Sequence, residues 1–308
     1  MIEMFKNLKL IYKMKKFITF IAIGLAFACS KIEPINTNPV VFNATGVSSK
    51  AIIENTVFPN ADFGVFADVN AVGEALTPEG TDFMNNDKYT NASGTVTAET
   101  TKYWIPDTQT QFYAYYPFGT VTSYLLHVDA NHQDDDCVDV MWAKPAIVTY
   151  NSGEDAPGTV NLDFKHQLAF LEFQAKEGTI VSGVKINSLK FTLNKEGDFN
   201  VKTAAWSNVG VSGDYNFSAN SLTNSYTTIG KVLVIPQNVA AITINYTATI
   251  LGYTYANKTR TIPVSKLGVA SWEKGKKYIY KISIDSSDVI SFGVSVSNWD
   301  DGTDTVIY

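Results

Sequence analysis

The chain has 308 residues, 45% of them hydrophobic and 18% charged, and its formal net charge is −6 at pH 7. This length is more than one hydrophobic core usually holds, so we expect two domains. An acidic chain with a single arginine, Arg260, is poorly suited to binding nucleic-acid phosphates. The two cysteines, Cys29 and Cys137, are too few for a disulfide framework.

The first 28 residues have the pattern of a secretory signal peptide. Lys15 and Lys16 precede an apolar run over residues 17–28. As a helix this run would be about 18 Å long, which is too short for a bilayer core of roughly 30 Å. We therefore predict that residues 1–28 are a removable signal peptide, with Met14 as the alternative true start. Removal of these residues takes away five lysines and one glutamate, which makes the net charge −10.

The apolar run stops at Cys29, where the sequence resembles a bacterial lipoprotein signal. In such signals the cysteine becomes the new N-terminus and carries acyl chains, and several chains together make a lasting membrane anchor. The resemblance is imperfect, because these signals favour leucine at the position of Ala26. Ordinary cleavage after Ala28 is the alternative. We expect lipid on Cys29, whereas Cys137 is expected to be a small buried apolar residue.

The rest of the chain has the composition of β-strands. Runs rich in Val, Ile, Thr, Tyr and Phe are separated by Asn, Gly, Asp and Pro, which is the pattern of antiparallel strands and turns. The clearest runs are residues 40–47, 62–69, 110–118, 168–175, 185–193, 231–236, 242–250, 277–284 and 290–299. We predict an all-β fold of two β-sandwich domains, residues 29–157 and 158–308, with the boundary in the turn-rich segment 149–159.

The second half of the chain also contains one candidate helix and one candidate hairpin. The best candidate for a short helix lies within residues 199–206. Ile290, Phe292, Val294 and Val296 alternate with small residues, which predicts a strand with one apolar face. The turn-forming letters DDG at 300–302, followed by residues 303–308, predict a terminal hairpin.

The densest group of potential metal ligands lies within residues 127–139. Carboxylates and imidazoles bind divalent metals, and the candidates are His127, His132, Asp134 and Asp136. Their spacing matches neither an EF-hand loop nor a zinc finger, and consecutive carboxylates on an extended chain point in alternating directions. We therefore favour a solvated acidic loop, and we expect neither a metal nor a cofactor.

Motifs of nucleophilic or metal-dependent catalysis are absent from the sequence. We find no nucleophile elbow, no phosphate-binding glycine loop and no H-E-x-x-H motif. His166 stands at the head of a strand, where we expect a hydrogen-bonded structural histidine. Asp300 and Asp301 have no acid/base partner at a fixed separation. Exposed aromatic residues could form a sugar platform, for which the candidates are Tyr113, Tyr115 and Tyr116.

Several phrases of the sequence occur together in one order. They are "FYAYYPF", "DVMWAKPAIVTYNSG" leading into "VNLDFKHQLAFLEFQAK", "LVIPQN", "WEKGKKYIYKISI" and "ISFGVSVSNWDDGT". In these phrases the chain resembles the fimbrillin family, the subunits of the lipoprotein-derived pili of Bacteroidales. The resemblance implies two transthyretin-like β-sandwich domains, export to the outer membrane through lipid on Cys29, and no enzymatic activity. It also implies that the partners are other pilus subunits in a fimbria at the cell surface.

The resemblance further implies how such subunits assemble. In the family, a surface protease removes the first strand, and a terminal strand of a neighbouring subunit fills the vacated groove by β-augmentation. The removable strand would be residues 39–47, with Val40, Phe42 and Ala44 on one face. The donor candidates are Ile290, Phe292, Val294 and Val296, or Val306 and Tyr308. A head-to-tail interface that does not close produces a fibre.

The chain departs from the family pattern at the cut site. Many polymerising members have an arginine after the first strand, whereas the matching position here is Lys50. Lysine keeps the positive charge but lacks the planar guanidinium. Two roles stay open: a stalk or tip subunit that is cut after Lys50, which we favour, and an uncut anchor or accessory subunit. A surface glycan-binding lipoprotein is the alternative from another class, and no residue identifies a host or bacterial receptor.

Overall fold

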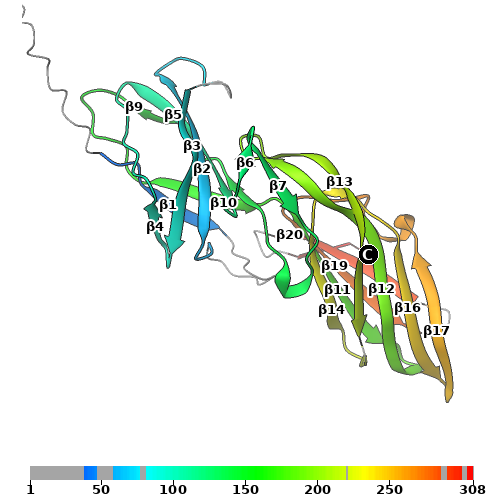
Figure 1. Ribbon diagram of the computed structural model, residues 1–308. Helices are drawn as coiled ribbons and strands as arrows, with labels where there is room; N and C mark the ends of the chain where they lie inside the picture. Colours follow the sequence, from blue (N-terminus) through cyan, green and yellow to red (C-terminus); the bar gives the residue numbers. More distant parts are fainter. Residues whose placement is uncertain are drawn as a thin grey trace, which may run out of the picture. The chain divides into compact units, whose positions relative to one another are not determined.

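The computed structural model describes residues 38–46, 58–76, 81–219, 221–285 and 290–299, and the backbone of 304–307 (Figure 1). Within these ranges the chain is all β, which confirms the predicted class. Its only helical pieces there are two short 3₁₀ turns, η1 (Asp134–Asp136) and η2 (Val264–Lys266). No helix in the same ranges has the length and apolar character needed to span a membrane.

The first sheet collects most strands of the N-terminal half. In the part of the chain that the structure describes, its order is β1-β10-β8-β5-β2-β3-β4, and β9 pairs with β5. The strands are β1 (Phe42–Gly46), β2 (Asp62–Ala71), β3 (Thr81–Ala92), β4 (Thr95–Ala98), β5 (Thr108–Tyr116), β8 (Met141–Ala143), β9 (Val148–Tyr150) and β10 (Val160–His166).

Strand β10 has the alternating pattern of a strand with one face in the core. Val160, Leu162, Phe164 and His166 are buried, whereas the residues between them are exposed. This strict alternation places every second side chain on the same face of the sheet. The buried face of β10 meets Phe58 and Phe63, whose rings lie 4.3 and 5.5 Å from that of Phe164.

Two further sheets form a β-sandwich (Figure 1). Over the described residues one has the order β14-β11-β19-β20-β21, and the other has the order β17-β16-β12-β7-β6, with β13 paired to β12. The first consists of β11 (Ala169–Glu177), β14 (Thr227–Val234), β19 (Lys276–Ile284), β20 (Ile290–Asn298) and β21 (Asp304–Ile307). The second consists of β6 (Val121–Thr122), β7 (Leu125–Asp129), β12 (Val181–Asn200), β13 (Ala205–Ala219), β16 (Ile242–Ile250) and β17 (Tyr253–Ile262). A small pair, β15 (Gln237–Asn238) and β18 (Ser271–Trp272), joins Gln237 to Trp272.

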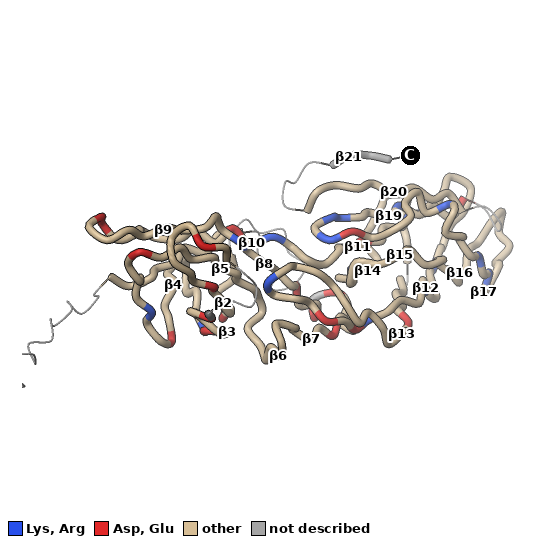
Figure 2. The backbone as a smooth tube through the Cα atoms, turned by 90° about the horizontal axis from the view of Figure 1, so that it is seen from above, with Lys and Arg blue, Asp and Glu red and all other residues tan. Residues whose placement is uncertain are grey.

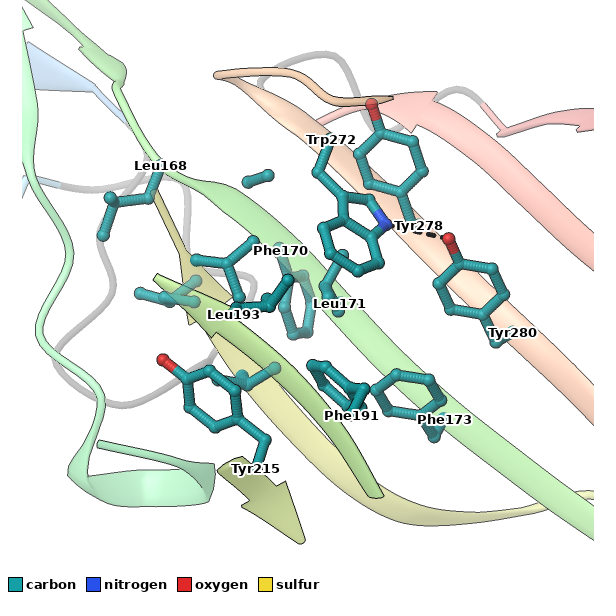
Figure 3. Close-up of a cluster of buried hydrophobic side chains, with 14 of the residues drawn as sticks. Leu168, Phe170, Leu171, Phe173, Phe191, Leu193, Tyr215, Trp272, Tyr278 and Tyr280 are labelled. Carbon is teal, nitrogen blue, oxygen red and sulfur yellow. Dashed lines mark hydrogen bonds between the residues drawn. The ribbon is translucent and has the colours of Figure 1, made fainter. Parts of the chain in front are cut away.

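The core of the sandwich is aromatic (Figure 3). Phe173 of β11 lies 5.3 Å from Phe191 of β12 and 5.3 Å from Tyr280 of β19, measured between ring centroids. The Trp272 indole N–H donates a 2.8 Å hydrogen bond to the Tyr280 hydroxyl, so the polar group of each buried ring has a partner. These contacts join the two sheets face to face.

The helix predicted within residues 199–206 is wrong. Phe199 pairs with Trp206 in the β12–β13 ladder, and residues 201–204 form the turn between these strands. The Asn200 side-chain oxygen accepts hydrogen bonds from the N–H groups of Lys202 and Thr203. A single hydrogen-bonded turn of this kind has the composition of a helix start but does not continue.

The predicted terminal hairpin is confirmed. Strand β21 pairs antiparallel with β20, with Val294 opposite Ile307 and Ser297 opposite Asp304. The predicted domain boundary at 157/158 stays a prediction. The strands on its two sides, β9 and β10, belong to the same sheet, whereas β7, from the preceding half of the chain, pairs with β12.

Candidate functional site

Strand β1 is an edge strand. It forms a parallel ladder with β10, with Phe42 opposite Val160 and Gly46 opposite Phe164. Just before it, the Val40 N–H donates to the carbonyl of Lys102 at 2.8 Å, and Pro39 makes an isolated bridge to Tyr103. A short edge strand can leave a sheet without breaking the ladders between the other strands, so β1 is separable in its topology.

The same strand contributes three side chains to the core of the first sheet. Val40 and Phe42 are each 4% exposed and Ala44 is 8% exposed, whereas Val41 between them is 43% exposed. The Phe42 ring packs edge-on against Tyr89 of β3 at 4.9 Å and Phe112 of β5 at 5.2 Å. Burial raises the pKa of Tyr89, which marks this surrounding as apolar. Departure of β1 would therefore remove the contacts that Phe42 makes with the Tyr89 and Phe112 rings.

Gly46 ends β1 at a very close backbone approach. Its φ is +145°, and a Cβ at this position would lie 2.7 Å from the Phe164 carbonyl oxygen. Only glycine fits such a contact without displacing the backbone of β10. This close approach lies four residues before the predicted cut after Lys50.

The C-terminal hairpin is the second part of the candidate site. Strand β20 pairs with β19 from Ile290, opposite Ile284, to Asn298, opposite Lys276. The predicted apolar face of β20 is the one that faces the core. Val294 is buried, and Ile290, Phe292 and Val296 are half-buried against the sandwich core, but Ser295 and Ser297 on the other face are buried as well. The second face of β20 is therefore covered at Ser295 and Ser297, whereas Ser291 on that face is exposed.

The backbone of β21, which carries Val306, lies at the edge of its sheet and, within the described ranges, pairs with β20 alone. Other predicted residues lie outside the residues that the structure describes: Cys29, Lys50, Asp300, Asp301 and Tyr308. Lipidation at Cys29 and cleavage after Lys50 therefore stay predictions.

The candidate metal ligands do not converge. In the described part of the chain no group of three His, Cys, Asp or Glu side chains could hold a metal ion. His127 instead faces Asp198 at 3.0 Å and Glu196 at 3.7 Å, while Asp134 accepts a hydrogen bond from the Lys231 N–H at 3.0 Å. His132 and Asp136 are exposed. Figure 2 shows several acidic residues near β7 and β13. Sequence reasoning missed Glu196 and Asp198 as partners of His127.

Two other predicted residues lie in the core. His166 is buried and hydrogen-bonded through Nδ1 to Asp139, and its ring stacks on Trp299 with centroids 3.6 Å apart. It is therefore a structural histidine, as predicted. Cys137 is also buried, and its thiol contacts the His132 carbonyl at 3.1 Å.

The three tyrosines considered for a sugar platform are all buried, because β5 is covered along most of its length. They are Tyr113, Tyr115 and Tyr116. The Tyr115 hydroxyl donates to the side-chain oxygen of Asn86 at 2.5 Å. A platform built from these residues is excluded, since a stacking sugar needs an exposed ring face.

The comparisons agree with this architecture. The model of the fimbrillin-like family matches residues 49–299. None of the curated proteins matches the sequence. A fimbrial protein from Bacteroides vulgatus has a TM-score of 0.57 at 17% identity, over 85% of this chain and 100% of its own. A candidate cell adhesion protein from Bacteroides uniformis has a TM-score of 0.56 at 22% identity, over 85% and 99%.

A third solved structure is similar: the tip fimbrial protein Mfa3 from Porphyromonas gingivalis, with a C-terminal truncation. Its TM-score is 0.51 at 12% identity, over 85% of this chain and 99% of that one. At these identities the likeness concerns the fold, whereas the family model covers most of the sequence. Proteins of this family are structural and have no enzymatic activity. The chain therefore belongs to the fimbrillin-like family.

Proposed function

We propose that this chain is a structural subunit of a cell-surface pilus, exported as a lipoprotein and assembled by strand exchange. In this proposal a protease cuts after Lys50, β1 departs with the lipid on Cys29, and a strand from a neighbouring subunit pairs with β10. The observation that carries the proposal is β1 itself: among the described residues it is an edge strand that forms a ladder with β10 alone, yet it buries Val40, Phe42 and Ala44. Family membership and the likeness to fimbrial proteins support it.

The incoming strand must supply what β1 supplies. Backbone hydrogen bonds to β10 give the pairing, and alternate apolar side chains must fill the groove beside Tyr89, Phe112 and Phe164. We propose residues 304–308 as the donor. Strand β21 lies at a sheet edge and can leave by breaking one ladder, whereas release of β20 would separate it from both β19 and β21.

The N-terminus of assembled chains tests the proposal. We expect filaments labelled by antibody to this chain, and mass spectrometry of sheared filaments should find chains that begin at Ala51. Filaments made of chains that still begin at acylated Cys29 would contradict it. The variant Lys50→Ala should stay at the membrane without filaments, whereas Lys50→Arg, which keeps a basic cut site, should assemble.

An anchor or accessory subunit is the second candidate. The observation that favours it is the close fit of β1, with three buried side chains and Gly46 against Phe164. In that case antibody label would be confined to the membrane, and Lys50→Ala would behave as the unchanged chain. The glycan-binding alternative has lost its best support, because Tyr113, Tyr115 and Tyr116 are buried.

A further inference from the structure

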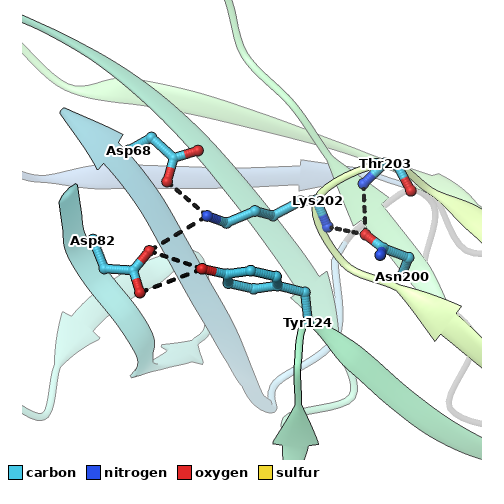
Figure 4. Close-up of polar contacts among 6 residues, drawn as sticks. All are labelled: Asp68, Asp82, Tyr124, Asn200, Lys202 and Thr203. Atoms are coloured by element: carbon cyan, nitrogen blue, oxygen red, sulfur yellow. Dashed lines mark hydrogen bonds and ion pairs between the residues drawn. The ribbon is translucent and has the colours of Figure 1, made fainter. Parts of the chain in front are cut away.

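Lys202 lies against two aspartates in a buried cluster (Figure 4). Its Nζ is 2.6 Å from Oδ1 of Asp68 and 3.3 Å from Oδ1 of Asp82. The side chains of Lys202 and Asp68 are 3% and 1% exposed. Asp68 in β2 stands opposite Asp82 in β3, whereas Lys202 comes from the turn between β12 and β13. The cluster thus joins two different sheets.

The backbone holds Lys202 in place. The Asn200 side-chain oxygen accepts 3.0 Å hydrogen bonds from the N–H groups of Lys202 and Thr203 (Figure 4). The Ala204 N–H donates to the Asn200 carbonyl at 2.8 Å. A turn fixed in this way presents the lysine amine to Asp68 with little freedom to move elsewhere, which is the preorganisation that a reaction between two groups needs.

Aromatic rings surround the pair of Lys202 and Asp68 and shield it from most solvent. Nζ of Lys202 lies 3.9 Å from the centre of the Tyr124 ring and 6.0 Å from that of Tyr113. Oδ2 of Asp68 is buried and has no hydrogen-bond partner among the residues that the structure describes. Asp82 is partly open to solvent, and its carboxylate accepts a hydrogen bond from the Tyr124 hydroxyl at 3.2 Å.

Burial acts on both members of the pair. It raises the pKa of Asp68, although the hydrogen bond from Lys202 opposes this, and so favours the neutral carboxylic acid. Burial also acts to lower the pKa of Lys202, but hydrogen bonds to Asp68 and Tyr124 outweigh it, so that pKa is raised. The resting state is an ion pair, and transfer of one proton from Nζ to Asp68 yields the neutral amine and acid side by side.

We propose that Lys202 and Asp68 condense into an intramolecular isopeptide bond. The lone pair of the neutral amine attacks Cγ of Asp68, forming the Nζ–Cγ bond. Asp82 accepts a proton from the attacking nitrogen and delivers it to the departing hydroxyl group. The Cγ–O bond breaks and one water molecule leaves, so the balance is amine plus acid giving amide plus water. No oxidant, reductant or other reactant is needed.

Two physical arguments favour condensation at this position. A buried ion pair loses the hydration of both charges, and its mutual attraction often fails to compensate for that loss. The amide removes both charges, and exclusion of water opposes the reverse hydrolysis. A surface pair lacks these conditions: Lys190 and Asp214 are only 2.5 Å apart, but their side chains are 50% and 44% exposed. That pair serves as an internal control.

Peptide mapping of the purified full chain tests the proposal independently of pilus assembly. Trypsin should not cut after a linked Lys202, so residues 196–231 should appear joined to residues 51–88, at the summed mass of the two peptides less one water. Fragmentation spectra should place the branch on Asp68. No branch should join Lys190 to Asp214. Free peptides 196–202 and 203–231, without the branched species, would overturn the proposal.

Three variants separate the linkage from folding. Lys202→Arg keeps a buried cation but has no nucleophilic amine, so the branched peptide should vanish while the chain stays folded by circular dichroism. Asp68→Ala should abolish the branch as well. Asp82→Asn should keep the ion pair yet lose most of the branched species, and an undiminished yield would remove Asp82 from the mechanism. A water loss that maps to the Asp301–Gly302 sequence, where succinimides form, would also count against the proposal.

Discussion

Cys137 is a residue whose chemistry is decided by its surroundings. It lies in the core, and burial raises the pKa of its thiol to about 12. The thiolate is the reactive form, so we expect the native chain to resist iodoacetamide at pH 8 and the denatured chain to react readily. Mass spectrometry of the peptide that contains Cys137 measures both rates. Equal rates in the two states would show that the thiol is exposed.

Gly230 and Gly293 make a matched pair at the residue scale. A Cβ on Gly230 of β14 would lie 2.1 Å from the ring of Phe217, whereas one on Gly293 of β20 would meet nothing within 4 Å. Gly230→Ala should therefore destabilise the fold by about 1–3 kcal/mol through overpacking. Gly293→Ala should be neutral or stabilising by about 0.5–1 kcal/mol, because glycine weakens a strand. Urea denaturation compares the two, and similar losses would contradict the packing argument.

At the scale of elements, sequence reasoning succeeded where one strand has one buried face. Residues 242–250, predicted as a strand, form β16, which buries every second residue from Ile242 to Ala248. The helix prediction failed at residues 199–206, where the pairing of Phe199 with Trp206 decides the structure. That pairing depends on a turn held by one asparagine side chain, and no periodicity in the sequence encodes it.

The packing of strand β1 can be tested through Phe42. Phe42→Ala removes a buried ring that contacts Tyr89 and Phe112, so the uncut chain should lose about 3–5 kcal/mol of stability. Val41→Ala, at an exposed neighbouring position, should change stability by less than about 0.5 kcal/mol. Denaturant unfolding of the uncut chain measures both. Equal effects would mean that β1 is not seated with Phe42 in the core.

At the scale of the whole molecule, composition predicted the class of fold but not its sheet topology. The pairing of β7 with β12 and the contact of Lys202 with Asp68 join residues far apart in the chain. Patterns within one segment carry no signal for such partners. Sequence reasoning therefore named candidate strands for exchange, through their composition and family resemblance, but missed the buried cluster of Lys202 altogether.

Assembly gives the last prediction. If residues 304–308 are the donor, a chain that ends at Gly302 should fold, because β20 stays paired with β19 along its length. After cleavage at Lys50 this chain should accept a strand but donate none. Alone it should remain monomeric, and mixed with the full-length cleaved chain it should shorten the filaments seen by electron microscopy. Filaments of normal length from the shortened chain alone would assign donation to another segment, and the nearest is β20.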